Sequence, residues 1–192
     1  MPVPTVTVTP APALSTTFPH PHLIFVYGTL KRGFPNHTLL SSLIATNDAH
    51  FHGSNYRTLN PFPLVCGPFR VPFLLHLPGQ GHRVWGELYS LSDLGLERVD
   101  ELEGVRVGNY ERLPIEVGDD EGGEVVAEGY FGNRSYGEAM WRRCGEKGIA
   151  RYEEEEAKGY VGRAGRPAGV SFLEHIWNFI GSGPDEDDGA PR

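Results

Sequence analysis

Two short blocks of this chain carry residue types that could perform proton-transfer chemistry. The first is an apolar run, Ile24 to Val26, that breaks into the turn Tyr27-Gly28-Thr29-Leu30. This pattern is typical of a buried strand that ends in a loop of exposed backbone N–H groups. The second block is Asp100 to Gly104, which places an acidic residue where an apolar one is expected. Backbone donors together with one misplaced carboxylate suffice for a simple proton-shuttling enzyme.

The carboxylate of interest is Glu103. A helix from Ser92 that stops at Gly104 puts Leu96, Val99 and Glu103 on one stripe, at spacings of three and four residues. Glu101 then lies on nearly the opposite side of the helix, and we expect its charge to face solvent. Partial burial and the negative end of the helix dipole should both raise the pKa of Glu103. The alternative is a helix that frays earlier and leaves Glu103 in water.

Other motifs give weaker signals. Gly28 and Gly33 have the glycine spacing of a phosphate-binding loop, but Phe34-Pro35 stand where Lys-Ser/Thr must follow, so nucleotide binding is rejected. A plain glycine turn remains the alternative for this loop. His50 and His52 would share one face of a strand, yet no third ligand is near them in sequence. We therefore expect no metal and no cofactor.

Several motifs occur together in a fixed order, and their order is more specific than any one of them. Between residues 23 and 131 the chain contains Tyr27-Gly28-Thr29-Leu30, Pro35-Asn36-His37, Pro63-Leu64-Val65, Pro72-Phe73-Leu74-Leu75, Gly86-Glu87-Leu88-Tyr89, Asp100 to Glu103 and Tyr110-Glu111-Arg112. This set resembles the signature of the gamma-glutamylcyclotransferase superfamily. It is most similar to the gamma-glutamylaminecyclotransferases and the plant avirulence-induced-gene-like proteins.

The resemblance implies a reaction and a set of site residues. A γ-glutamyl amine or γ-glutamyl amino acid would cyclise to 5-oxoproline and release its amine. The catalytic acid/base falls on Glu103 and the substrate-binding backbone on Tyr27, Gly28, Thr29 and Leu30.

Two aromatic residues are also expected at this site. Phe73 would line the apolar part of the leaving-group pocket, and Tyr110 would place its hydroxyl near the carboxylate or would simply pack in the core. A non-enzymatic member of the fold, binding a small ligand or a protein, is the alternative function. Residues 152–180 resemble an extension of plant-type relatives that could cover the pocket.

The pattern of elements predicts an α+β fold, with a small mixed β-barrel and flanking helices. Strands are expected at 23–27, 49–56, 71–77, 84–91, 110–117 and 124–131, and helices at 36–44, 92–103, 135–143 and 171–180. Asn36 should cap the first helix, while Ser135 and Ser171 each begin a capping box.

Composition and charge bound the remaining inferences. A chain of 192 residues with 39% hydrophobic content fits one domain, which we place at residues 23–180. Residues 1–22 and the acidic tail 181–192 are expected to be disordered. A net charge of −8 disfavours nucleic-acid and anionic-membrane partners. The two cysteines are too few for a disulfide framework, which indicates a cytoplasmic protein. Organelle import through residues 1–22 is the alternative, and the sequence does not indicate an oligomeric state.

Overall fold

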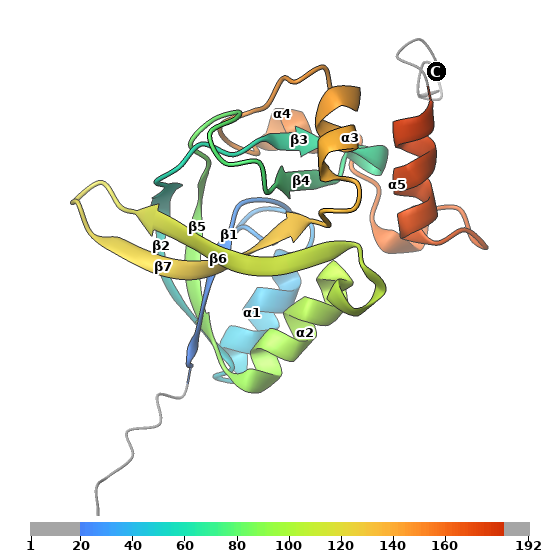
Figure 1. Cartoon of the computed structure of the whole chain (residues 1–192). Coiled ribbons are helices and arrows are strands. Elements are labelled where there is room, and N and C mark those ends of the chain that lie inside the picture. Colours follow the sequence, from blue (N-terminus) through green and yellow to red (C-terminus); the bar gives the residue numbers. More distant parts are fainter. Residues whose placement is uncertain (1–19, 183–192) are drawn as a thin grey trace, which may run out of the picture.

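A computed structural model describes residues 20–182, in which one mixed sheet is surrounded by short helices (Figure 1). The strands are β1 (His22–Val26), β2 (Ala49–Thr58), β3 (Leu64–Cys66), β4 (Pro72–Leu75), β5 (Trp85–Leu91), β6 (Tyr110–Gly118) and β7 (Glu124–Gly132). The helices are α1 (His37–Ala45), α2 (Asp93–Glu103), α3 (Gly137–Arg143), α4 (Glu154–Ala157) and α5 (Phe172–Gly181). The expected α+β class is confirmed.

The strand pairings form a ring. In the order β1-β5-β2-β6-β7-β4-β3, strand β1 is antiparallel to β5 and also pairs in parallel with β7. The path through β1, β5, β2, β6 and β7 therefore returns to its first strand. Strands β4 and β3 continue outward from β7, and Figure 1 shows them on the opposite side of the long β6–β7 ribbon from α1 and α2.

Both faces of β1 are buried, which explains its unbroken apolar run. Ile24 and Val26 belong to a core cluster that includes Val99 of α2, whereas Phe25 and Tyr27 belong to a second cluster. The alternation follows the two-residue period of a strand. Strand β1 thus lies between two parts of the core, and the Gly28 turn follows directly at its end.

Helix α2 has the ends that the sequence predicts. The Ser92 hydroxyl accepts a hydrogen bond from the N–H of Gly95 at 3.0 Å, a normal N-cap. The helix stops at Gly104, whose left-handed backbone (φ 67°) favours glycine. A Cβ at this position would also lie 2.4 Å from Nδ2 of Asn109. Glu103 is therefore held as the last residue of a well-defined helix.

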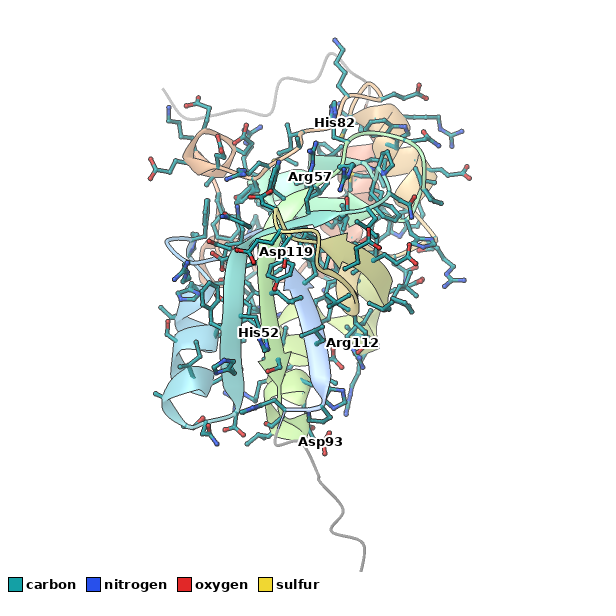
Figure 2. The ribbon with its side chains drawn as sticks, turned by 90° about the vertical axis from the view of Figure 1, so that its left-hand side faces the viewer. His52, Arg57, His82, Asp93, Arg112 and Asp119 are labelled. Atoms are coloured by element: carbon teal, nitrogen blue, oxygen red, sulfur yellow. The ribbon has the colours of Figure 1, made fainter. Side chains whose placement is uncertain are left out.

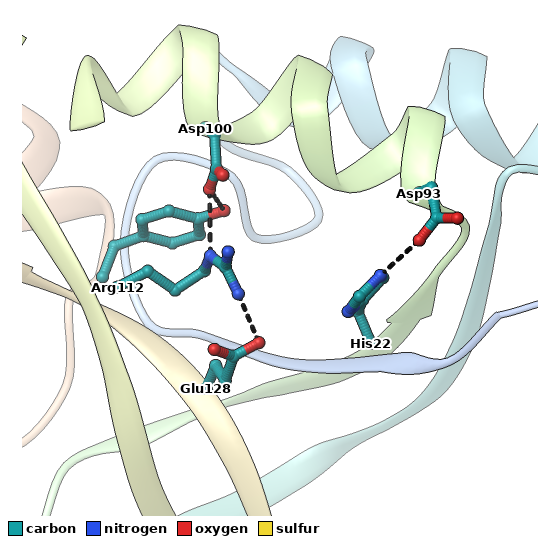
Figure 3. A network of polar contacts seen from close by, with 6 residues as sticks. His22, Asp93, Asp100, Arg112 and Glu128 are labelled. Atoms are coloured by element: carbon teal, nitrogen blue, oxygen red, sulfur yellow. Dashed lines mark hydrogen bonds and ion pairs between the residues drawn. The ribbon is translucent and has the colours of Figure 1, made fainter. Parts of the chain in front are cut away.

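Strand β1 begins one residue earlier than predicted. Of the segment 1–22 that we expected to be disordered, residues 1–19 lie outside the described residues, but His22 already belongs to β1 and pairs with Leu91. Its Nε2 lies 2.7 Å from Oδ1 of Asp93 (Figure 3). At the other end, Gly181 is the last residue of α5, and residues 183–192 lie outside the described part. Local composition signals disorder but misses such long-range pairing.

Two of the three predicted caps are wrong. The Asn36 side chain makes no cap, because it donates instead to Oγ1 of Thr29 and to the hydroxyl of Tyr160. Ser135 lies in a turn, and α3 begins at Gly137. The capping box of Ser171 is confirmed, with its hydroxyl accepting from the N–H of Glu174.

Strand β3 was not predicted. Three residues between Pro63 and Gly67 are too short to show a strand period.

Candidate active site

A cavity of about 400 Å³ lies where the end of β1, the end of α2 and the start of β6 meet. Its walls include six of the seven residues predicted for the site, namely Tyr27, Gly28, Thr29, Leu30, Glu103 and Tyr110. The two sequence blocks that suggested chemistry are therefore brought together in space. The volume suits a small-molecule ligand rather than a macromolecule.

The Gly28 turn supplies unused backbone donors to this cavity. Among residues 20–182, no protein group accepts a hydrogen bond from the N–H of Gly28, Thr29 or Leu30. Gly28 is required by space, because a Cβ there would lie 2.7 Å from Cγ of Pro72. Adjacent open N–H groups are a suitable site for a carboxylate or a developing oxyanion.

Tyr27 contributes to the walls mainly through its packing. Its hydroxyl donates to the backbone oxygen of Tyr130 at 2.6 Å and accepts from the N–H of Leu74 at 3.3 Å. Burial and the neighbouring Glu103 raise the pKa of this phenol well above its usual range. The hydroxyl is thus neutral and engaged within the protein, and it fixes β1 against β7 and β4.

Glu103 is partly buried at the cavity wall, and its carboxylate forms no hydrogen bond with any residue in the range 20–182. Burial raises its pKa to about 7, with a further increase from Asp100 and an opposing effect of Arg163. The direction matches the expectation from the helical stripe, on which Leu96 and Val99 are buried. Glu101, in contrast, is exposed.

Asp100, drawn in Figure 3, has a different role from that of Glu103. Its Oδ1 accepts from the hydroxyl of Tyr130 at 2.6 Å and from Nε of Arg112 at 3.1 Å. Arg112 in turn donates through Nη1 to Glu128 at 2.5 Å. This network connects α2 to β6 and β7 and offsets the charge of Asp100, so it holds the end of α2 beside the cavity. Its members are far apart in the chain, so local sequence patterns do not reveal it.

The two aromatic predictions have different outcomes. Tyr110 lines the cavity, but its hydroxyl donates to the backbone oxygen of Pro72 at 2.9 Å. Phe73 is completely buried, does not reach the cavity, and stacks on Tyr110 with ring centroids 5.1 Å apart. Its placement in the pocket was wrong because the neighbouring Pro72 lines the cavity, and successive residues of a strand point to opposite faces.

Four polar residues of the carboxy-terminal segment complete the cavity walls. The spacing of residues in the sequence did not identify any of them as site residues. They are Tyr160, Arg163, Arg166 and His175. The Tyr160 hydroxyl accepts from Nδ2 of Asn36 at 3.1 Å, and the same Nδ2 donates to Oγ1 of Thr29 at 2.9 Å. This bridge connects the Gly28 turn to the segment. We expected residues 152–180 to be able to cover the pocket, and these contacts place part of them on it.

The two histidines that form the candidate metal pair lie together on β2. The rings of His50 and His52 are 5.0 Å apart on β2, and Figure 2 labels His52 on this strand. Between residues 20 and 182 no group of three or more His, Cys, Asp or Glu side chains is arranged to hold a metal ion. In the same part of the chain, no helix is both long enough and apolar enough to cross a membrane.

Comparison with solved structures places this fold among known ones. The crystal structure of an AIG2-like protein from Mus musculus matches with a TM-score of 0.63 and 32% sequence identity, over 76% of this chain and 98% of that one. This chain therefore shares its fold with the mouse protein over about three quarters of its length (76%).

Sequence comparisons give the family. A model of the family "Gamma-glutamyl cyclotransferase, AIG2-like" matches residues 24–150. An Arabidopsis thaliana protein named "Putative gamma-glutamylcyclotransferase At3g02910" is 49% identical over 173 residues, which are 83% of this chain and 92% of the relative. The human gamma-glutamylaminecyclotransferase is 49% identical over 82 residues, covering 42% of this chain and only about half (52%) of the human protein. The chain belongs to the AIG2-like gamma-glutamyl cyclotransferase family.

Proposed function

We propose that this protein is a gamma-glutamylcyclotransferase that converts a γ-glutamyl amine or γ-glutamyl amino acid to 5-oxoproline and the free amine. The observation that carries the proposal is the meeting of open backbone donors at Gly28 to Leu30 with the carboxylate of Glu103 in one cavity. The names of the family and of its relatives give the same reaction class. The ligand is a small molecule, in keeping with the volume of the cavity.

In the proposed reaction the substrate supplies its own nucleophile. The α-amine attacks the γ-carbonyl carbon, a C–N bond forms in a five-membered ring, and the C–N bond to the leaving amine breaks. One proton leaves the α-amine and one must reach the departing nitrogen. Because the attack is intramolecular, orientation contributes a large part of the acceleration, with effective molarities of about 10⁵ M or more.

Glu103 is assigned the proton transfers, first as base and then as acid. A carboxyl group with a pKa of about 7 is ionised in a useful fraction of molecules at neutral pH and can still return its proton. The N–H groups of the Gly28 turn are assigned the substrate α-carboxylate or the oxyanion. The ring of strand pairings, read as a small closed barrel, would hold the two parts at a fixed separation.

The direct test is 5-oxoproline release from a panel of γ-glutamyl compounds that differ in the leaving amine. We expect turnover of at least one γ-glutamyl amine or amino acid by the purified protein. A binding protein of the same fold would instead retain the ligands unchanged, and stoichiometric binding without any 5-oxoproline would favour that alternative.

The dependence of kcat/KM on pH should follow the ionisation of the Glu103 carboxyl group. Since the base must be ionised in the free enzyme, kcat/KM should fall as the pH decreases through about 7, the pKa to which burial raises this carboxyl. An unperturbed glutamate, with a pKa of about 4.3, would keep activity to much lower pH. The control is the pH profile of the residual activity of Glu103→Gln on the same substrate. Any fall of kcat/KM that comes from titration of the substrate α-amine should be present in both proteins. An unchanged acid limb in the variant would assign the proton to another group.

We also place this activity in the cytoplasm, as part of the proposal. Cys66 and Cys144 are both free thiols, which fits a reducing compartment.

A further inference from the structure

The carboxy-terminal side of the cavity is cationic. Arg163 and Arg166 both line it, and neither forms an ion pair with a carboxylate of residues 20–182. Arg163 donates to the backbone oxygen of Leu102 at 3.2 Å and Arg166 to that of Val161 at 3.1 Å, and the Tyr160 hydroxyl also lies beside the Arg166 guanidinium. A guanidinium carries five N–H donors, so most donors of both side chains stay available to a ligand.

Arg166 is held firmly rather than left free in solvent. Its guanidinium carbon lies 4.3 Å from the ring centroid of Phe172 and 5.5 Å from that of Phe69. Phe69 adopts a left-handed backbone (φ 59°, ψ 22°), and its oxygen accepts from the N–H of Val161 at 3.1 Å. A left-handed conformation is costly for a residue other than glycine and persists only where the surrounding structure fixes it. The strained turn keeps the Phe69 ring under Arg166.

His175 closes the cavity wall next to Phe69. Its Nε2 is buried and has no hydrogen-bond partner, and it is the one such side-chain atom among residues 20–182. The imidazole lines the same cavity and packs edge-on against Phe69 at 4.8 Å. Buried polar atoms are nearly always paired in native proteins, but this Nε2 has no surface open to the cavity, so we assign His175 to the wall of the site and not to ligand binding.

We propose that Arg163 and Arg166 form a subsite for an anionic group on the leaving amine, so that the preferred substrates are γ-glutamyl compounds whose leaving amine carries a carboxylate. This inference rests on the proposed function. This inference takes the first of the two roles proposed for the Gly28 turn, in which its N–H groups hold the α-carboxylate of the γ-glutamyl group, and it brings the α-amine to Glu103. The cationic side of the cavity therefore remains for the leaving group, and a neutral amine would leave the guanidinium groups unpaired.

The experiment compares two substrates that differ only in this charge, γ-glutamyl-L-alanine and its carboxamide, γ-glutamyl-L-alaninamide. The quantity measured is the ratio of their kcat/KM values, which does not depend on the fraction of folded protein. Since a charge-assisted hydrogen bond contributes roughly 1.5–3 kcal/mol, the wild type should favour the carboxylate by about tenfold to a hundredfold. Arg166→Gln and Arg163→Gln should each bring the ratio toward one.

The matched control is Arg142→Gln, an exposed arginine of α3 that does not line the cavity, and it should keep the wild-type ratio. A wild-type ratio near one, or a ratio unchanged in both arginine variants, would overturn the subsite while leaving the cyclotransferase proposal intact. If no γ-glutamyl compound yields 5-oxoproline, the proposed function itself fails and the subsite loses its basis.

Discussion

Glu103→Gln should lower kcat/KM for 5-oxoproline formation by about 10²- to 10⁴-fold, the usual contribution of a positioned general acid/base. Glutamine keeps the size of the side chain but can neither take up nor return the proton. The change should not unfold the protein, because the Glu103 carboxylate forms no hydrogen bond within residues 20–182 and burial already disfavours its charge. The measurements are steady-state kinetics and a thermal unfolding curve.

The control for this variant is Glu101→Gln, on the same helix. Glu101 is exposed and points away from the stripe of Leu96 and Val99, so its charge should not matter for turnover. Equal activity of the two folded variants would show that the carboxylate on the stripe is not the proton carrier. Loss of activity in Glu101→Gln alone would have the same meaning.

Acetylation of the substrate α-amine should stop turnover completely. The modified nitrogen is a poor nucleophile, and no group of the protein is assigned to replace it. The control is to change the leaving amine while keeping the α-amine free, which should alter the rate but not remove it. The products are followed by mass spectrometry, and release of the amine from the acetylated compound would indicate hydrolysis by water instead of cyclisation.

Strong local patterns made part of this site predictable. Helix α2 has a regular apolar stripe, a serine cap and a glycine stop, so both of its ends and the position of Glu103 follow from the sequence. The unbroken apolar run of β1 marks a strand that is buried on both faces. These signals depend on neighbouring residues only, and the structure agrees with them closely.

Long-range contacts made the rest unpredictable. Strand β4 is buried at every position, so its pattern does not tell which side chain faces the cavity, and Phe73 was placed there wrongly. Asn36 has the residue type of a helix cap, but Thr29 and Tyr160 compete for its side chain. Arg166 reaches the site through the fold of a segment that lies beyond the residues matched by the family model. None of these partners is visible in local spacing.

The central claim is that the substrate amine, rather than water, attacks the γ-carbonyl. The most direct test is to run the reaction in water enriched in oxygen-18 and to identify the products by mass spectrometry. Cyclisation predicts unlabelled 5-oxoproline, formed in equal amount to the released amine, because no oxygen enters from the solvent. Free glutamate carrying oxygen-18 in its γ-carboxylate would contradict the account, since it would mean that an activated water breaks the bond.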